Sequence, residues 1–403
     1  MAARPPPPLV DDLMREIFQR VRPHDPRALV RAAAGCTSWR GIICDADFAR
    51  EYREFHGAPP MLGFLHEELD YPRRAFDEAY WVSHFVSTAT FRPPACQERP
   101  YWHALDSRHG LVLFYTPRME ADFVVCDLLT GNEWEIHASP KCGDIMWWED
   151  DEDEKLERIH CNAAVLCAND RCDHLDCHGG PFRVALVGSS DGALVAHAIV
   201  YSSETGEWSD MIEVQYPNCI NGCGHSAVVG SKVYVPCLES DTVLEYNFGE
   251  QKLSVIDAPF EDQDQNQPYL ELMGVEDGML FFASVVDARL YLWSMEAGPS
   301  GTAGWAQRRV IELEPLLPPA AVSEKSDALP VGFAEGVSVI FLRTEDGLYT
   351  IDLKSGKCEK VHDRIHGFYF EKVMPYMSFY TGAWGRLPNS QQASHAVVGA
   401  TTI

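Results

Sequence analysis

The chain has 403 residues, of which 46% are hydrophobic and 11% aromatic, which is enough apolar material for a packed core and excludes disorder as its overall state. Its 33 basic and 60 acidic residues give a net charge of −27, which repels phosphate backbones and anionic lipids, so we expect neither a nucleic-acid nor a membrane partner. Thirteen cysteines, without an apolar leader after Met1, predict reduced thiols and a cytosolic or nuclear location.

The first 57 residues predict three or four short amphipathic helices. Apolar residues recur at helical spacing from Leu9 to Val21, on more than one face. Asp25 and Pro26 are typical of a second helix start, and the next stretch, around Trp39, is also helical. Asp45 caps the last segment, which ends at Gly57. A unit this small has a marginal core, so its surplus apolar surface favours contact with another polypeptide.

The order of residues in this segment resembles the F-box. The positions that match are the run from Leu9 to Val21, then Leu29, Arg31, Cys36, Trp39, Arg40, Ile43, Asp45 and Phe48. The resemblance implies binding to a Skp-type adaptor and through it to a cullin-RING ubiquitin ligase, so the chain would be an adaptor and not a catalyst. It also implies which residues form the adaptor interface and the core behind it, namely Leu9, Leu13, Ile17, Leu29, Cys36 and Trp39.

Three positions depart from the motif. Val10, Gly35 and Thr37 stand where the family usually has proline, valine and a basic residue. An F-box fold that no longer assembles a ligase therefore stays an alternative. A second alternative is an ordinary helical subdomain that packs on its own chain.

Beyond residue 57 the pattern predicts β-structure. Strand-length apolar runs alternate with clusters of Gly, Asp, Ser and Pro, and we expect a linker over 58–80, β-structure over 81–385 and a flexible tail over 386–403. A weak repeat, clearest at Thr130–Trp134 and Thr205–Trp208, marks one turn in each unit. Its glycines recur every 43 to 55 residues once a longer first interval is set aside, and four-stranded propeller blades repeat at roughly this spacing.

The repeat predicts an all-β propeller of about six blades, with an insertion near 140–180 in the long first interval. Kelch glycine pairs occur only once and Trp-Asp is absent, so neither named repeat fits. The region resembles the propeller-like associated region of plant F-box proteins, including the closing segment Met374–Tyr380. That resemblance implies that this part binds the substrate protein, whose identity the sequence leaves open.

Cysteines and histidines gather in the insertion. Cys172, His174, Cys177 and His178 are soft ligands that suit zinc, with Cys161 and Cys167 before them and Cys219, Cys223 and His225 after. The spacing is not that of two paired Cys-x2–4-Cys motifs, so a reduced, metal-free loop and no cofactor is the interpretation we favour. A structural zinc ion is the alternative.

Evidence for catalysis is weak, and we expect no catalytic residue. Ser190 lies in a Gly-x-Ser-x-Gly pattern, but another strand follows it where a nucleophile elbow needs a helix. The acidic run Glu149–Glu154 is typical of a solvated loop, or of a landing site for a basic partner. Two alternatives to an adaptor remain, a propeller enzyme and a propeller that binds a small molecule or sugar.

Overall fold

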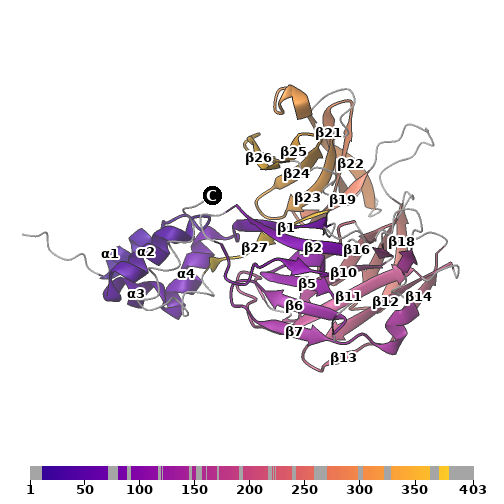
Figure 1. Cartoon of the computed structure of the whole chain (residues 1–403), viewed down its shortest axis with the longest axis horizontal. Helices are drawn as coiled ribbons and strands as arrows, with labels where there is room; N and C mark the ends of the chain where they lie inside the picture. The colour runs from indigo at the N-terminus through magenta and orange to yellow at the C-terminus, as the bar shows by residue number, and fades with distance from the viewer. Residues whose placement is uncertain are drawn as a thin grey trace, which may run out of the picture.

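In the computed structural model, a small helical unit lies beside a larger ring of β-sheets (Figure 1). The structure describes residues 11–70, 80–88, 92–116, 119, 121–144, 148–150, 157–159, 161–169, 172–189, 194–216, 220, 222, 224–237, 242–257, 270–297, 303–321, 328–363 and 372–380. No helix among these residues is long and apolar enough to cross a membrane.

Four helices form the N-terminal unit, and their bounds follow local signals. They are α1 (Asp11–Gln19), α2 (Pro26–Gly35), α3 (Thr37–Ile43) and α4 (Ala46–His56). Pro26 opens α2, where its fixed φ suits the first helical turn. The Asp45 carboxylate accepts a hydrogen bond from the Phe48 N–H and caps α4, and Gly57, at φ 73°, ends it. The predicted helices are therefore present.

The β-region is a propeller of six blades, each an antiparallel sheet of four strands except blade 3, which has five. Blade 1 contains β27 (Val373–Met377), β1 (Met61–Asp70), β2 (Tyr80–Ser87) and β3 (Arg99–Pro100). Blade 2 contains β4 (His103–Arg108), β5 (Leu111–Tyr115), β6 (Phe123–Asp127) and β7 (Glu133–Ile136). Blade 3 contains β10 (Cys161–Cys167), β11 (Phe182–Ser189), β12 (Val195–Ser202) and β13 (Glu207–Trp208), and β14 (Ile212–Gln215) also pairs with β12.

The remaining blades follow the same order. Blade 4 contains β15 (Ala227–Val229), β16 (Lys232–Pro236), β17 (Thr242–Asn247) and β18 (Lys252–Asp257). Blade 5 contains β19 (Glu271–Glu276), β20 (Met279–Val286), β21 (Arg289–Ala297) and β22 (Ala303–Glu312). Blade 6 contains β23 (Leu329–Ala334), β24 (Val339–Thr344), β25 (Gly347–Asp352) and β26 (Cys358–Asp363). Short 3-10 helices lie at Pro140–Asp144 and Pro319–Ala321.

Both ends of the β-region meet in blade 1. Strand β27 pairs antiparallel with β1, with Leu65 opposite Met374, so the last strand completes the first sheet. The leading strand of each sheet lies toward the middle of the ring, where β4 contacts β10 and β27, and β19 contacts β15 and β23. The ring is thus closed by strand pairing between its first and last strands, and each blade keeps a short outer edge strand.

The first strand corrects the expected domain boundary. The segment 58–80 does not serve as a linker, because it contains β1, whose residues Leu62, Phe64 and Leu65 are buried. Residues 62–66 of β1 are buried in an unbroken run, and the charged residues that follow make the segment resemble a polar linker in the sequence. Helix α4 and β1 are separated only by residues 57–60, and the expected tail 386–403 lies outside the described residues.

The repeated turn joins the third and fourth strands of a blade. Gly131, Gly206 and Gly356 occupy it in blades 2, 3 and 6, each with φ between 72° and 74°, a region that favours glycine. Each glycine N–H donates to the carbonyl four residues earlier, at 2.8 Å. The insertion after blade 2 contains a separate two-stranded hairpin, β8 (Trp148–Asp150) and β9 (Glu157–Ile159).

The repeat contains one further element, which the spacing of its glycines does not reveal. The residue that ends the third strand is Asp127, Asn247 or Asp352, and its side-chain Oδ1 accepts backbone N–H groups two and three residues later. This is an Asx turn, which fixes the backbone at the start of the loop, and the positive-φ residue fixes it at the end. The sequence signal was an Asp or Asn four residues before the turn's positive-φ residue.

Candidate functional site

The outer surface of α1 carries two large apolar side chains. Met14 and Phe18 form the buried row of this helix, whereas Leu13 and Ile17 are 44% and 43% exposed on the next row. Trp39 of α3 is 38% exposed, and its ring meets that of Phe18 edge-on at 5.8 Å. Figure 1 places α1 and α3 at the end of the helical unit away from the propeller. We call Leu13, Ile17 and Trp39 the apolar helical face.

The other predicted residues of this surface divide between core and boundary. Leu29 is 1% exposed and belongs to the helical core, and Cys36 is half-buried between α2 and α3. Leu9 lies outside the described residues. The structure therefore brings Leu13, Ile17 and Trp39 to the surface and keeps Leu29 behind them.

Polar contacts fix α1 against α4. The Arg15 guanidinium bonds to the Asp45 carboxylate and lies 3.6 Å from Glu51 Oε2. Arg15, followed by the Phe48 N–H, lowers the pKa of Asp45. The Tyr52 hydroxyl donates to the Val21 carbonyl at 2.8 Å. These contacts hold the apolar helical face in a fixed relation to α4.

Helix α4 in turn packs on the propeller. One hydrophobic cluster contains helical residues, including Phe48 and Tyr52, together with propeller residues such as Tyr376. The Tyr52 ring meets that of Phe379 edge-on at 6.2 Å, and Arg53 forms an ion pair with Asp176 at 2.9 Å. The helical unit and the ring thus share a core, and we call this contact the joint.

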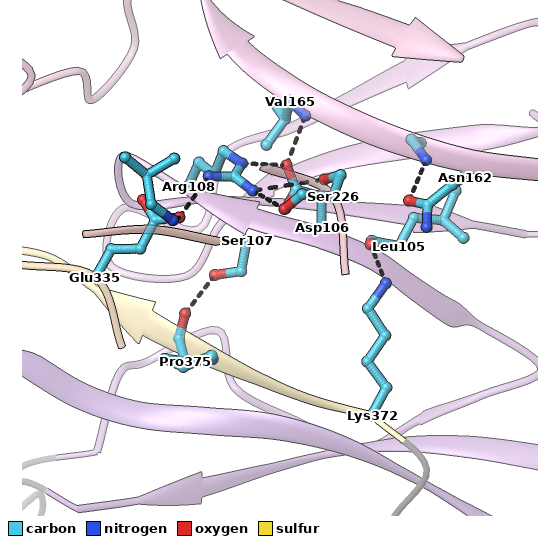
Figure 2. Close-up of polar contacts among 12 residues, drawn as sticks. Leu105, Asp106, Ser107, Arg108, Asn162, Val165, Ser226, Glu335, Lys372 and Pro375 are labelled. Atoms are coloured by element: carbon cyan, nitrogen blue, oxygen red, sulfur yellow. Dashed lines mark hydrogen bonds and ion pairs between the residues drawn. The ribbon is translucent and has the colours of Figure 1, made fainter. Parts of the chain in front are cut away.

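A polar network occupies the middle of the ring (Figure 2). Arg108, at the end of β4, lies 3.0 Å from Asp106 Oδ2 and 3.3 Å from Glu335 Oε1, and it also donates to the Ser226 carbonyl. Asp106 accepts a hydrogen bond from the Val165 N–H at 2.8 Å. The Glu335 carboxylate accepts one from the Val275 N–H at 3.0 Å. These side chains and backbone groups come from blades 2 to 6.

Further hydrogen bonds extend this central network. Lys372, just before β27, donates to the Leu105 carbonyl at 2.8 Å, and Ser107 donates to the Pro375 carbonyl at 3.0 Å (Figure 2). His225 Nε2 lies 2.9 Å from the Val331 carbonyl, and burial, then Lys372, lowers its pKa to about 3. Each charged group of this network contacts a partner in another strand or blade. The network therefore links blades across the middle of the ring, and we call it the cross-brace.

The cysteine-rich loop between β10 and β11 brings four soft ligands together. Ligand atoms of Cys167, Cys172, His174 and Cys177 all lie within 4.8 Å of one another. Burial, then the neighbouring Cys167 thiol, raises the pKa of Cys177. Three of the four residues predicted as zinc candidates are in this cluster.

His178, the fourth candidate, does not join the cluster. Its Nδ1 lies 2.9 Å from Asp127 Oδ2 and its Nε2 lies 2.9 Å from Ser378 Oγ, so both ring nitrogens are engaged elsewhere. Cys167, at the end of β10, takes its place because the strand carries it to the loop. Cys161, at the other end of β10, is buried between blades, and Cys219 and Cys223 lie outside the described residues.

Strands lie on both sides of the pattern around Ser190. Strands β11 and β12 pair antiparallel from Arg183 to Ser189, and where the described residues resume after Ser189 the chain enters β12 and not a helix. Ser190 itself lies outside the described residues. A surface cleft of about 410 Å³ lies between blades 3 and 4, at the Arg183 end of β11 and away from Ser189, and its lining includes Arg183, Glu207, Trp208 and Gln251.

The propeller sequence matches a known family. Residues 103–383 match the family described as "F-box protein AT5G49610-like, beta-propeller". The chain belongs to this family. The match covers blades 2 to 6 and the closing strand β27, and it supports the plant F-box resemblance of the propeller region. The matched residues begin after the four helices and do not include them.

Comparison with solved structures finds alignments of low similarity. The propeller domain of the Trilobed protease from Pyrococcus furiosus aligns with a TM-score of 0.36 and 11% identity over 76% of this chain and 94% of that one. A prolyl endopeptidase aligns with a TM-score of 0.36 and 10% identity over 88% and 53%. AztD from Citrobacter koseri aligns with 0.33 and 12% over 75% and 69%. No curated protein matches the sequence significantly.

Proposed function

We propose that the protein is a substrate-recognition subunit of a Skp–cullin–F-box ubiquitin ligase. In this proposal the helical unit is an F-box that binds a Skp-type adaptor, and the propeller binds the target protein. The observation that carries it is the apolar helical face of Leu13, Ile17 and Trp39, exposed on a chain whose propeller belongs to an F-box protein family. The role is non-catalytic, and it fits a cytosolic or nuclear location.

The helical surface has the chemistry of a protein interface. Leu13 and Ile17 are four residues apart and therefore neighbours on one side of α1, a spacing typical of a helix that docks into an apolar groove. Complete burial of each such side chain stabilises a complex by about 1.5–3 kcal/mol. Because Leu13 and Ile17 are 44% and 43% exposed in the isolated chain, an adaptor that covers them gains a little under half of this free energy from each side chain.

The joint supports action by proximity. An adaptor subunit accelerates ubiquitin transfer by raising the effective concentration of the target's lysine near the charged partner, which requires a defined distance between its two binding surfaces. The shared core around Tyr52 and Phe379 supplies such a fixed connection. With a net charge of −27, the chain favours a basic target.

The test is adaptor binding by the full chain. We expect Leu13→Asp combined with Ile17→Asp to weaken binding to a Skp-type adaptor at least about 100-fold, because two charges would be buried in an apolar contact. Val255→Asp is the matched control, since this propeller residue is 42% exposed in β18 and should leave binding unchanged. Titration by calorimetry measures both, with circular dichroism as the check on folding.

Two results would contradict the proposal. Undiminished binding by the double variant would show that the apolar helical face is not the interface. If the unmodified chain binds no Skp-type adaptor, the departures at Val10, Gly35 and Thr37 have removed ligase assembly, and the F-box fold serves another purpose.

A further inference from the structure

The loop between β10 and β11, residues 168–181, contains a compact set of metal-ligand atoms. Cys172 Sγ and Cys177 Sγ are 3.5 Å apart, and Cys177 Sγ is 3.7 Å from His174 Nδ1. Cys167 completes the set from the end of β10, within the same 4.8 Å limit.

The Cys172–Cys177 and Cys177–His174 separations match those of a zinc tetrahedron, and the Cys167 thiol lies within reach of the same centre. Zn–S bonds of about 2.3 Å and Zn–N bonds of about 2.0 Å, at tetrahedral angles, place the ligand atoms roughly 3.5–3.8 Å apart. Three thiolates and one imidazole are a ligand set that selects zinc over magnesium or calcium, which prefer oxygen. Four protein ligands leave no open position, and closed sites of this kind are structural.

We propose that Cys167, Cys172, His174 and Cys177 bind one zinc ion, which fixes the 168–181 loop. The proposal replaces the metal-free loop favoured on sequence spacing alone. The fourth ligand is Cys167 and not the predicted His178. The fold brings Cys167 to the other three ligands, which its distance in the sequence does not suggest. It does not depend on adaptor binding.

The surroundings of the site already orient its ligands. The His174 N–H donates to Cys172 Sγ at 3.4 Å, a backbone contact that suits a thiolate ligand. The His174 ring stacks on His109 at a centroid distance of 4.2 Å. The Ala168 N–H donates to the Pro181 carbonyl at 3.0 Å and closes the base of the loop. The ligands therefore need little ordering when the ion binds, which favours affinity.

The position of the site gives it a structural consequence. Leu175 and Asp176 lie between two of the ligands, His174 and Cys177. Leu175 packs against the hydrophobic cluster shared by helices and propeller, and Asp176 pairs with Arg53 of α4. An ion held on both sides of this dipeptide would fix the loop that supports the joint.

The first experiment measures metal in the full chain, purified reduced, without chelator, from cells grown with added zinc. We expect about one equivalent of zinc by mass spectrometry, and a tetrahedral thiolate absorption spectrum when cobalt(II) replaces it. Cys172→Ser and His174→Ala should each lower the zinc content to less than half. Cys358→Ser, a half-buried cysteine of β26 far from the loop in sequence, should leave it unchanged.

Several outcomes would overturn the proposal. Less than half an equivalent of zinc in protein with all thiols reduced would do so, as would a Cys172–Cys177 disulfide in freshly purified protein. Full zinc content in Cys172→Ser would also contradict it. Should a variant fail to fold, the cobalt spectrum of the unmodified chain, stripped of metal and reloaded, decides the question alone.

A second measurement tests the consequence for the joint. We expect hydrogen exchange of residues 172–180 and of α4 to increase at least about 10-fold when zinc is removed from the unmodified chain by chelator, while exchange in blade 5 stays unchanged. Increased exchange in the loop alone would mean that zinc binds without supporting the joint. Because this readout involves no adaptor, it stays separate from the outcome of the adaptor-binding test.

Discussion

At the scale of single residues, the buried Asp127 carboxylate holds two loops in place through hydrogen bonds. Asp127 ends β6, is fully buried, and accepts two N–H groups of the following turn as well as the His178 ring. Burial would raise the pKa of Asp127, but the hydrogen bond from His178 and the Thr130 contacts lower it overall. One carboxylate thus anchors both a blade turn and the cysteine-rich loop.

This anchor predicts a pH-dependent stability. Because the pKa of Asp127 is lower in the folded chain than its unfolded value of about 3.9, its contribution is present above pH 4 and is lost as the pH falls. Asp127→Asn should reduce the free energy of unfolding by about 1.5–3 kcal/mol at pH 7, a difference that shrinks toward pH 2.5. Urea unfolding across this pH range measures it.

The matched control is Asp352→Asn in blade 6. Asp352 makes the same Asx turn, through Lys354 and Ser355, but lies near the surface, and we expect its replacement to cost less than about 1 kcal/mol. An equal loss for Asp127→Asn at pH 7 and pH 2.5 would mean that the charge of the Asp127 carboxylate does not contribute.

At the scale of elements, the closing strand is held by close backbone approach. Strand β23 of blade 6 lies beside β27 of blade 1, and a Cβ atom added to Gly332 would lie 2.4 Å from the Val373 carbonyl oxygen. This glycine sits where the β23–β24 register shifts, between Pro330 and Gly332. The absence of a side chain there lets two neighbouring blades touch through their inner strands.

We therefore expect Gly332→Ala to destabilise the propeller by about 1–3 kcal/mol, because a backbone atom cannot move aside cheaply. Gly304→Ala is the control, since nothing lies within 4 Å of the added carbon in β22, and its effect should stay within about 0.5 kcal/mol. Chemical unfolding compares the two variants. Equal stabilities would show that β23 and β27 have room to separate.

At the scale of the whole molecule, the ring is braced from inside. Arg108 joins Asp106 of its own strand to Glu335 of blade 6 and to Ser226 beside blade 4, so one guanidinium connects elements more than 200 residues apart. The pairing of β27 with β1 closes the ring within blade 1, and this network connects the blades across the middle of the ring. The strand pairing and the polar network together stabilise the ring on which the helical unit packs.

The cross-brace predicts a loss in the free energy of unfolding when Arg108 is removed. Arg108→Met should destabilise the chain by about 3–5 kcal/mol, because it leaves the largely buried Asp106 carboxylate, and the Glu335 carboxylate beside it, without their cation. Arg289→Met is the control, because its pair with Glu312 is on the surface and should contribute less than about 1 kcal/mol. Thermal and urea unfolding provide the comparison, and a small loss for Arg108→Met would contradict the cross-brace.

The sequence by itself determined the features that depend on neighbours a few residues away. Local backbone preferences determine where two helices start, at Pro26 and after Asp45, and where the glycine turns lie, at Gly131, Gly206 and Gly356. The number of blades follows from the spacing of the repeat. The surplus apolar width of α1 was also visible. These features depend on residues that are close together in the chain or on the spacing of the repeat.

Only the tertiary structure decided which residues meet. It placed Met14 and Phe18 inward and Leu13 outward, made β1 part of blade 1, and exchanged His178 for Cys167 in the cysteine cluster. It also joined Arg108 to Glu335. Each of these outcomes depends on packing between segments far apart in the chain, which leaves no periodic trace in the sequence of either one.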